Sequence, residues 1–143
     1  MTHVSAGWHA YQYVVMRCVP RVEREEFVNV GVVLHCPEVD FLQARFALDE
    51  QRLTALHADL DVAAVGAAAD AVARICVGAG QRGYTAALRA TAYGTREVRE
   101  DAGTRFGLVR APRSTVLQPG PVHGGLTRDP AASLEHLVRT LVG

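Results

Sequence analysis

Three segments near the beginning of the chain decide its fold: residues 11–19 read YQYVVMRCV, residues 27–34 read FVNVGVVL, and residues 41–48 read FLQARFAL. Each is rich in β-branched and aromatic residues, and Pro20 and Pro37 follow the first two, which is typical of β-strands. The connection 21–26 (RVEREE) is expected to form a turn or a short helical loop. Because the connections are short, we predict an antiparallel meander.

Alternation along these strands assigns their side chains to two faces of the sheet. The apolar face is predicted to form the core and carries Val14, Met16, Cys18, Val28, Val30, Val32, Leu34, Leu42, Ala44, Phe46 and Leu48. The second face carries Tyr11, Tyr13, Val15, Arg17, Asn29, Gly31, Val33, His35, Gln43 and Arg45. One register among a few that satisfy this pattern pairs Arg17 with Asn29 and Gly31 with Arg45. The second face is either open or covered by the C-terminal segment.

Helices are predicted after the strands. Asp49 is a suitable N-cap for a helix with leucines at 53, 56 and 60, and Asp61 for a second helix that ends at Gly78 and Gly80. Asp129 and Pro130 predict the start of a last helix, whose buried stripe is Leu134, Leu137, Val138, Leu141 and Val142. Between these helices we expect a variable loop region at 79–105, strands at 106–109 and 115–118, and an extended loop at 118–125.

The expected fold is therefore α+β: an antiparallel β-meander of about four or five strands with helices packed on one face. A chain of 143 residues fits a single domain, with residues 1–7 as a loose leader. No secretory signal pattern is found and the longest apolar run is too short to span a bilayer, so we expect no membrane contact and a cytoplasmic location.

Composition excludes several classes of protein. The formal net charge is zero, so a nucleic-acid partner is not expected. Lysine is absent, which rules out Schiff-base chemistry by this chain. The three cysteines are odd in number and form no CxxC pair, so neither a disulfide framework nor a thiolate zinc site is predicted. We expect no cofactor and no metal.

Two segments resemble a bacterial domain-of-unknown-function family catalogued under number 3037. One is 11–34, with its Tyr-x-Tyr strand, charged turn and the run Glu-Phe-Val-Asn-Val-Gly-Val at 26–32; the other is 106–130, with Ala-Pro-Arg-Ser-Thr at 111–115, Gln118-Pro119 and Asp129-Pro130. Where other members have Gly before the Glu-Phe-Val-Asn run, this chain has Glu25. The resemblance implies no activity. Genes of this family are associated with neighbouring kinases that look like the toxin kinase of persistence modules. The resemblance therefore implies a protein partner, such as a kinase, and a role in a toxin–antitoxin pair.

Arg17, Glu26 and Asn29 form the first candidate site. An acid, an amide and a guanidinium at one end of a sheet suit the binding of a phosphate or the positioning of a water. Gly31, on the same face as Arg45, would let a ligand approach closely. The structural alternative is that Arg17 pairs with Glu26 while Asn29 satisfies the loop that joins the strands.

Arg113, Ser114, Thr115 and Gln118 form the second candidate site. An arginine and hydroxyls after a proline-initiated turn suit an anion, and the alternative is a turn whose hydroxyls cap the neighbouring backbone. This cluster converges with the first only if the strand near Gln118 joins the edge of the meander.

His123 and His35 come third. A histidine in a Gly/Pro loop can act as a general base or a ligand, although a lone loop histidine is usually solvated. Cys36 beside His35 suggests a metal site with Cys18, but in the hairpin the two cysteines lie about 20–25 Å apart at a rise of about 3.3 Å per residue. One metal ion cannot bridge that distance.

Two functions are compatible with these patterns. The first is a non-catalytic protein-interaction module that uses its aromatic and arginine-bearing face to bind another protein or a second copy of itself. The second is an enzyme or sensor that acts on a phosphate-bearing small molecule or nucleotide. A pocket that gathers both motifs favours the second function, and a flat or chain-covered face favours the first.

Overall fold

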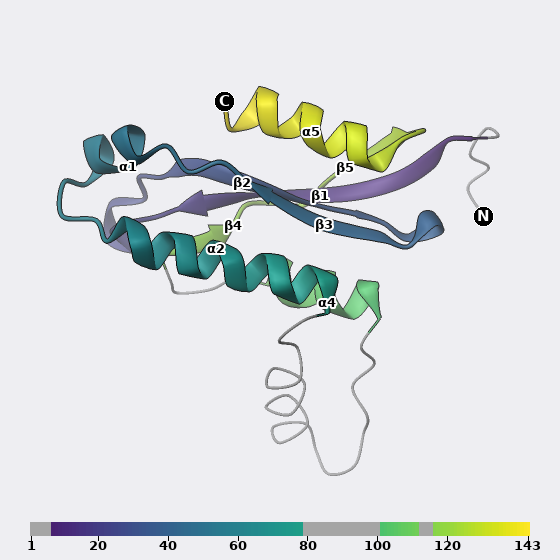
Figure 1. Ribbon diagram of the computed structural model, residues 1–143, viewed down its shortest axis with the longest axis horizontal. Helices are drawn as coiled ribbons and strands as arrows, with labels where there is room; N and C mark the ends of the chain where they lie inside the picture. Colours follow the sequence, from purple (N-terminus) through teal and green to yellow (C-terminus); the bar gives the residue numbers. More distant parts are fainter. Residues whose placement is uncertain (1–6, 79–100, 112–115) are drawn as a thin grey trace, which may run out of the picture.

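A five-stranded antiparallel sheet forms the centre of the computed structural model, which describes residues 7–78, 101–111 and 116–143 (Figure 1). The strand order is β3-β2-β1-β4, and β5 also pairs with β1, beyond β4. The consecutive strands β1, β2 and β3 form the expected meander. The strands are β1 (His9–Cys18), β2 (Val28–Cys36), β3 (Phe41–Phe46), β4 (Leu117–Pro119) and β5 (His123–Thr127).

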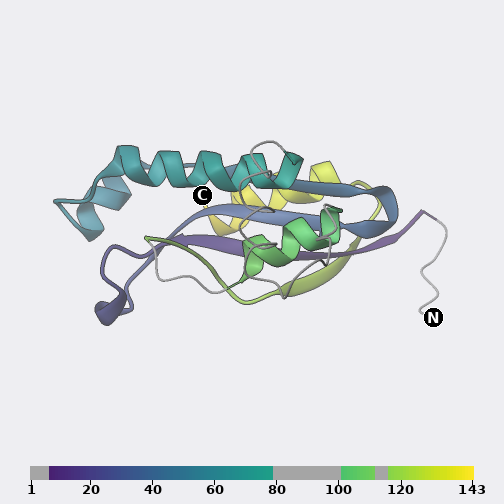
Figure 2. The same ribbon diagram turned by 90° about the horizontal axis from the view of Figure 1, so that it is seen from below.

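Helices lie on both faces of this sheet. Figures 1 and 2 show α2 and α4 on one face and α5 on the other. The α+β class and the antiparallel sheet are confirmed, but the prediction that helices pack on one face is wrong, because α5 covers the second face. The helices are α1 (Glu50–Leu56), α2 (Val62–Val77), α4 (Ala102–Arg110) and α5 (Pro130–Leu141), and two short 3-10 turns are η1 (Val22–Arg24) and η2 (Pro37–Val39).

A β-bulge at Val30 explains why the predicted faces of β2 are partly wrong. Arg17 pairs with Asn29 as expected, but Met16 pairs with Gly31, so Val30 is an extra residue in β2. Beyond the bulge the alternation is inverted, and Gly31 pairs with Phe46 instead of Arg45. The side chains after the bulge therefore exchange faces.

The inversion gives the sheet two hydrophobic cores. The first lies under α2 and α4, and its β2 residues are Val30 and Val33. The second lies under α5, where Val32, Leu34 and Cys36 pack against Leu134, Val138 and Val142. Val32 and Leu34, expected in the first core, are thus fully buried in the second. His35, expected on the outer face, is buried in the first.

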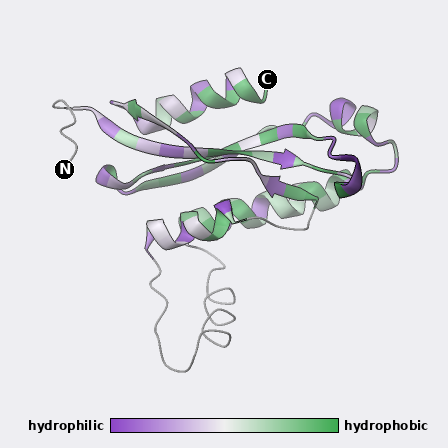
Figure 3. Cartoon of the chain, turned by 180° about the vertical axis from the view of Figure 1, so that it is seen from behind, coloured by the Kyte–Doolittle hydropathy of each residue, from purple (hydrophilic) through white to green (hydrophobic). Residues whose placement is uncertain are grey.

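The helix N-termini follow the sequence. Asp49, Asp61 and Asp129 each accept a hydrogen bond from the backbone N–H three residues later, as expected for N-caps. Gly78 ends α2 in the left-handed conformation, with φ of 84°. Figure 3 shows the resulting pattern, with hydrophobic residues along α2 and the strands and a strongly hydrophilic connection between β1 and β2.

Two predicted elements differ in the structure. Residues 106–109 belong to α4, not to a strand, because Ala102, Phe106 and Val109 recur at helical spacing and bury one side of it. The predicted loop at 118–125 contains the end of β4 and most of β5, since β1 offers its free edge to the glycine-rich segment. Of the expected variable region 79–105, residues 79–100 lie outside the described residues, and 102–105 are helical. Within the described residues, every helix is too short or too polar to span a bilayer.

Candidate functional site

Three strands bring polar residues from both sequence motifs into one row across the sheet. Arg17 in β1 pairs with Asn29 in β2 on one side and with Gln118 in β4 on the other. Directly paired residues of an antiparallel sheet point to the same face, which here is the face covered by α5. The strand near Gln118 thus joins the edge of the meander, so the condition for convergence of the two motifs is met.

Arg17 is the central residue of this row. Its guanidinium carbon lies 4.1 Å from the centroid of the Phe27 ring, a cation–π arrangement. Its Nε is buried without a hydrogen-bond partner, and Arg17 forms no ion pair with any residue in the described ranges. A half-buried guanidinium held by an aromatic ring but lacking an acceptor is an unusual feature in a folded protein.

An open groove of about 290 Å³ lies beside Arg17. Phe27 and Val22 are 44% and 54% exposed at this groove. Among its described lining residues are one cation, Arg17, and one acid, Glu25. The groove therefore suits a ligand that has an apolar part and an anionic group placed at Arg17. The described lining residues are Arg17, Val19, Val22, Glu25, Phe27, Gln118 and Pro119.

Gly120 allows the chain to pass close to Arg17 after β4. Its N–H donates to the carbonyl of Val15 at 2.8 Å. A Cβ at position 120 would lie 3.1 Å from the guanidinium carbon of Arg17 and 3.2 Å from the Val15 carbonyl oxygen. Because Gly120 has no side chain, the Arg17 guanidinium has room to lie against Phe27.

Asn29 has a structural contact. Its Nδ2 donates to the carbonyl of Leu141 at 3.1 Å, at the C-terminus of α5, where backbone carbonyls lack partners within the helix. Arg52 supports the same end by donating to the carbonyl of Val142 at 2.7 Å. The Oδ1 of Asn29 is buried without a partner. Asn29 thus attaches α5 to β2, which is a structural contact other than the predicted one with the loop that joins the strands.

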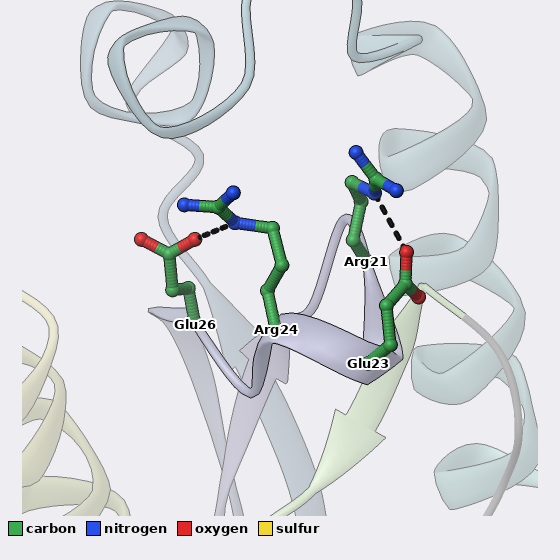
Figure 4. Close-up of polar contacts among 4 residues, drawn as sticks. All are labelled: Arg21, Glu23, Arg24 and Glu26. Carbon is green, nitrogen blue, oxygen red and sulfur yellow. Dashed lines mark hydrogen bonds and ion pairs between the residues drawn. The ribbon is translucent and has the colours of Figure 1, made fainter.

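Glu26 does not pair with Arg17, so the structural alternative for these two residues is wrong. Glu26 pairs with Arg24 instead, and the Arg21 Nε donates to Glu23 at 2.7 Å. Figure 4 shows these two pairs side by side in the turn. The hydrogen bond and the charge of Arg24 lower the pKa of Glu26. The arginines and glutamates of the charged turn thus pair with one another. Glu26 lies in this turn, before β2 begins, and not in the row formed by Arg17, Asn29 and Gln118.

The remaining candidates are dispersed. Arg45 forms an ion pair with Glu135 at 2.5 Å, which links β3 to α5. His123 is the first residue of β5, with its ring 5.3 Å from that of Tyr13. Arg113, Ser114 and Thr115 lie outside the described residues, so their predicted role stays a prediction.

His35 and the three cysteines are buried in the cores. The ring of His35 lies 5.2 Å from that of Phe106, and burial, assisted by the charge of Arg105, lowers the pKa of His35. Burial raises the pKa of Cys18 and of Cys36, and raises that of Cys76 to about 12, so these thiols stay protonated near neutral pH. Within residues 7–78, 101–111 and 116–143, no three His, Cys, Asp or Glu side chains gather as a metal site would require.

Sequence reasoning missed Phe27 and Gly120. A signal for Phe27 was present, because it precedes Asn29 by two residues and so shares its face, diagonal to Arg17. Gly120 gave no signal among the other glycines of its segment, because its role depends on where β4 pairs.

Comparison with known proteins identifies one matching family. A family described as "Protein of unknown function (DUF3037)" matches residues 13–142. Neither the curated proteins nor the solved structures include a significant match.

Proposed function

Since the match spans nearly its whole length, this chain belongs to the DUF3037 family of proteins of unknown function, and we propose from its geometry that it is a non-catalytic module which binds an acidic segment of a partner protein in the groove beside Arg17.

The unpaired guanidinium of Arg17 carries the proposal. A carboxylate that enters the groove would form charge-assisted hydrogen bonds with this guanidinium, whose Nε has no partner in the folded chain. Because Phe27 already holds the guanidinium plane at 4.1 Å, little side-chain freedom is lost on binding. The folded chain is therefore prepared for an anionic group at this position.

The composition of the groove favours a protein segment over a small phosphate ligand because, of the candidate residues in the described chain, only Arg17 and Gln118 line it, so the groove does not gather the two motifs in full. Among the described lining residues, Arg17 is the sole cation, whereas phosphates are usually held by several donors at once. Exposed Phe27 and Val22 offer apolar area next to the charge, and arginine with aromatic residues is the composition of interface hot spots. A kinase as the partner remains a prediction from the family resemblance.

The test begins with selection of peptides from a random phage-displayed library on the folded chain. Selected peptides are synthesised, and their binding is measured by fluorescence anisotropy at low and high salt. We expect acidic residues next to aliphatic ones and binding that weakens with salt. We also expect R17Q and F27A to weaken binding at least about tenfold, which is about 1.4 kcal/mol.

Arg128 offers a matched control. Its guanidinium carbon lies 4.7 Å from the Trp8 ring, at the other end of β1, so R128Q removes a comparable cation–π pair far from the groove. R128Q should leave peptide affinity unchanged. Selection of peptides without acids, or equal affinity for R17Q, would contradict the proposal. Tighter Arg17-dependent binding of ATP or inorganic phosphate than of any peptide would support the phosphate-ligand function instead.

Stability provides an independent measurement. Because Arg17 has no acceptor to lose, R17Q should keep or raise the melting temperature, as is common for residues that serve binding. A loss of several kcal/mol would instead assign Arg17 to a structural interaction.

A further inference from the structure

The outer edge of β5 is open. His123–Thr127 pairs with β1 along one side, and in the described residues no strand pairs with its other side. Leu126 is 58% exposed and Val122, just before the strand, is 38% exposed. The backbone N–H and C=O groups along such an edge can pair with another strand.

The opposite edge of the sheet is protected in the way that is usual for edge strands. β3 carries Arg45, which pairs with Glu135 of α5, and both α2 and α5 contact this strand. By contrast, residues 116–127 read VLQPGPVHGGLT and contain no Asp, Glu, Lys or Arg. Proline blunts the part of this segment near Pro119 and Pro121, which leaves β5 as the unprotected strand.

We propose that β5 pairs with β5 of a second copy of this chain, so that two sheets join into one across a twofold axis. A twofold axis normal to the sheet requires one residue of an antiparallel strand to face its own copy. With Gly125 at the axis, Leu126 of each copy lies opposite Gly124 of the other, where no side chain obstructs it.

The side chains near Gly125 are compatible with this arrangement. A Cβ at position 125 would lie 2.6 Å from the hydroxyl oxygen of Tyr11, so the Tyr11 side chain already fills this position on the face of α5. The opposite face is that of Ala10 and Leu126, which are paired residues of β1 and β5. The two Leu126 side chains would therefore lie diagonally across the joint on that face.

A second copy suits this edge better than an unrelated strand does. The strand carries no charge with which to select a partner, and its glycines at 124 and 125 complement the leucine at 126 when the strand is antiparallel to itself. The Arg17 groove lies at the other end of β1, so dimerisation leaves it open. A dimer would present two grooves and could bind a bivalent partner more tightly.

The test is sedimentation velocity of the full chain over concentrations up to about 1 mM, the weak end of specific association. We expect a concentration-dependent dimer. L126K and L126E should weaken dimerisation at least about tenfold, because a charged side chain on an edge strand opposes edge pairing. V77K is the matched control, since Val77 is 68% exposed on α2 and distant from β5.

Hydrogen exchange identifies the residues that pair in the dimer. Amides of residues 123–127 should exchange more slowly as the protein concentration rises, and circular dichroism should show that all variants are folded. A chain that stays monomeric at the highest concentration overturns the proposal, and so does a dimer that L126K and L126E leave intact. Protection of 123–127 only in the presence of another protein's extended peptide also overturns it. None of these outcomes affects the peptide-binding test, because that test measures how peptide affinity depends on Arg17 and not on the oligomeric state.

Discussion

Replacing Gly31 with Ala tests the inverted alternation of β2 directly. A methyl group at this position would contact Cδ1 of Phe46 and would lie 2.8 Å from its Cε1 and 2.9 Å from the Arg45 carbonyl oxygen, whereas nonbonded carbon atoms prefer about 3.5–4.0 Å. The Phe46 ring must move, and β2 must separate slightly from β3. Overpacking of this kind typically costs about 1–3 kcal/mol, and we expect the upper part of that range because one of the contacts is with backbone.

The measurement is urea unfolding followed by circular dichroism, in which the midpoint should fall while the m-value stays unchanged. A loss of this size should lower the melting temperature by about 5–10 °C. G31A combined with F46L should lose less than the two single changes added together, because the smaller side chain relieves the contact.

The control is G107A in α4, where a Cβ would have no atom within 4 Å. This change should stabilise the protein by about 0.5–1 kcal/mol through helix propensity. If the alternation of β2 continued from Asn29 without a bulge, Gly31 would face α5 instead of Phe46, and G31A would not bring a methyl group against Phe46. A gain in stability from G31A would therefore refute the bulge at Val30.

Other changes test separate parts of the structure. Glu25 has a φ of 57°, so E25G should stabilise the protein by up to about 1 kcal/mol in urea unfolding, since left-handed backbone costs non-glycine residues about 1–2 kcal/mol; a loss would show that the side chain contributes more than the strain. N29A removes the hydrogen bond to the Leu141 carbonyl and should cost about 1–2 kcal/mol, and an unchanged midpoint would show that α5 does not need this attachment. Because the folded pKa of His35 is lowered, its contribution to stability is present above the unfolded pKa of about 6.5 and is lost as the pH falls below it. Melting temperatures between pH 5 and 8 should show this decline, and H35L should reduce it; equal declines in both proteins would exclude His35 as the cause.

Much of the fold was predictable because its signals are local. Asp49, Asp61 and Asp129 are N-caps by the chemistry of their own side chains, and the three strands of the meander follow from β-branched runs between prolines. The bulge was not predictable, because Val28, Val30, Val32 and Leu34 form an uninterrupted apolar row that simple alternation already satisfies. One additional valine therefore leaves no mark on the pattern.

The site was predictable in part for a related reason. The pairing of Arg17 with Asn29 requires only the register of two neighbouring strands, and it was found. The pairing of Arg17 with Gln118 depends on a strand about one hundred residues later in the chain, and no local pattern specifies which edge that strand joins. Glu26 was misassigned because a turn that pairs its own charges cannot be distinguished in sequence from one that offers them to a neighbouring strand.

The position of α5 at the end of the fold has a consequence for biosynthesis. Domains are made from the N-terminus onward, so β1, β2 and β3 leave the ribosome well before residues 130–141. Until then, the side of the sheet that carries Val32, Leu34 and Cys36 has no cover. A nascent chain that stalls before α5 would therefore present this apolar surface to chaperones and proteases.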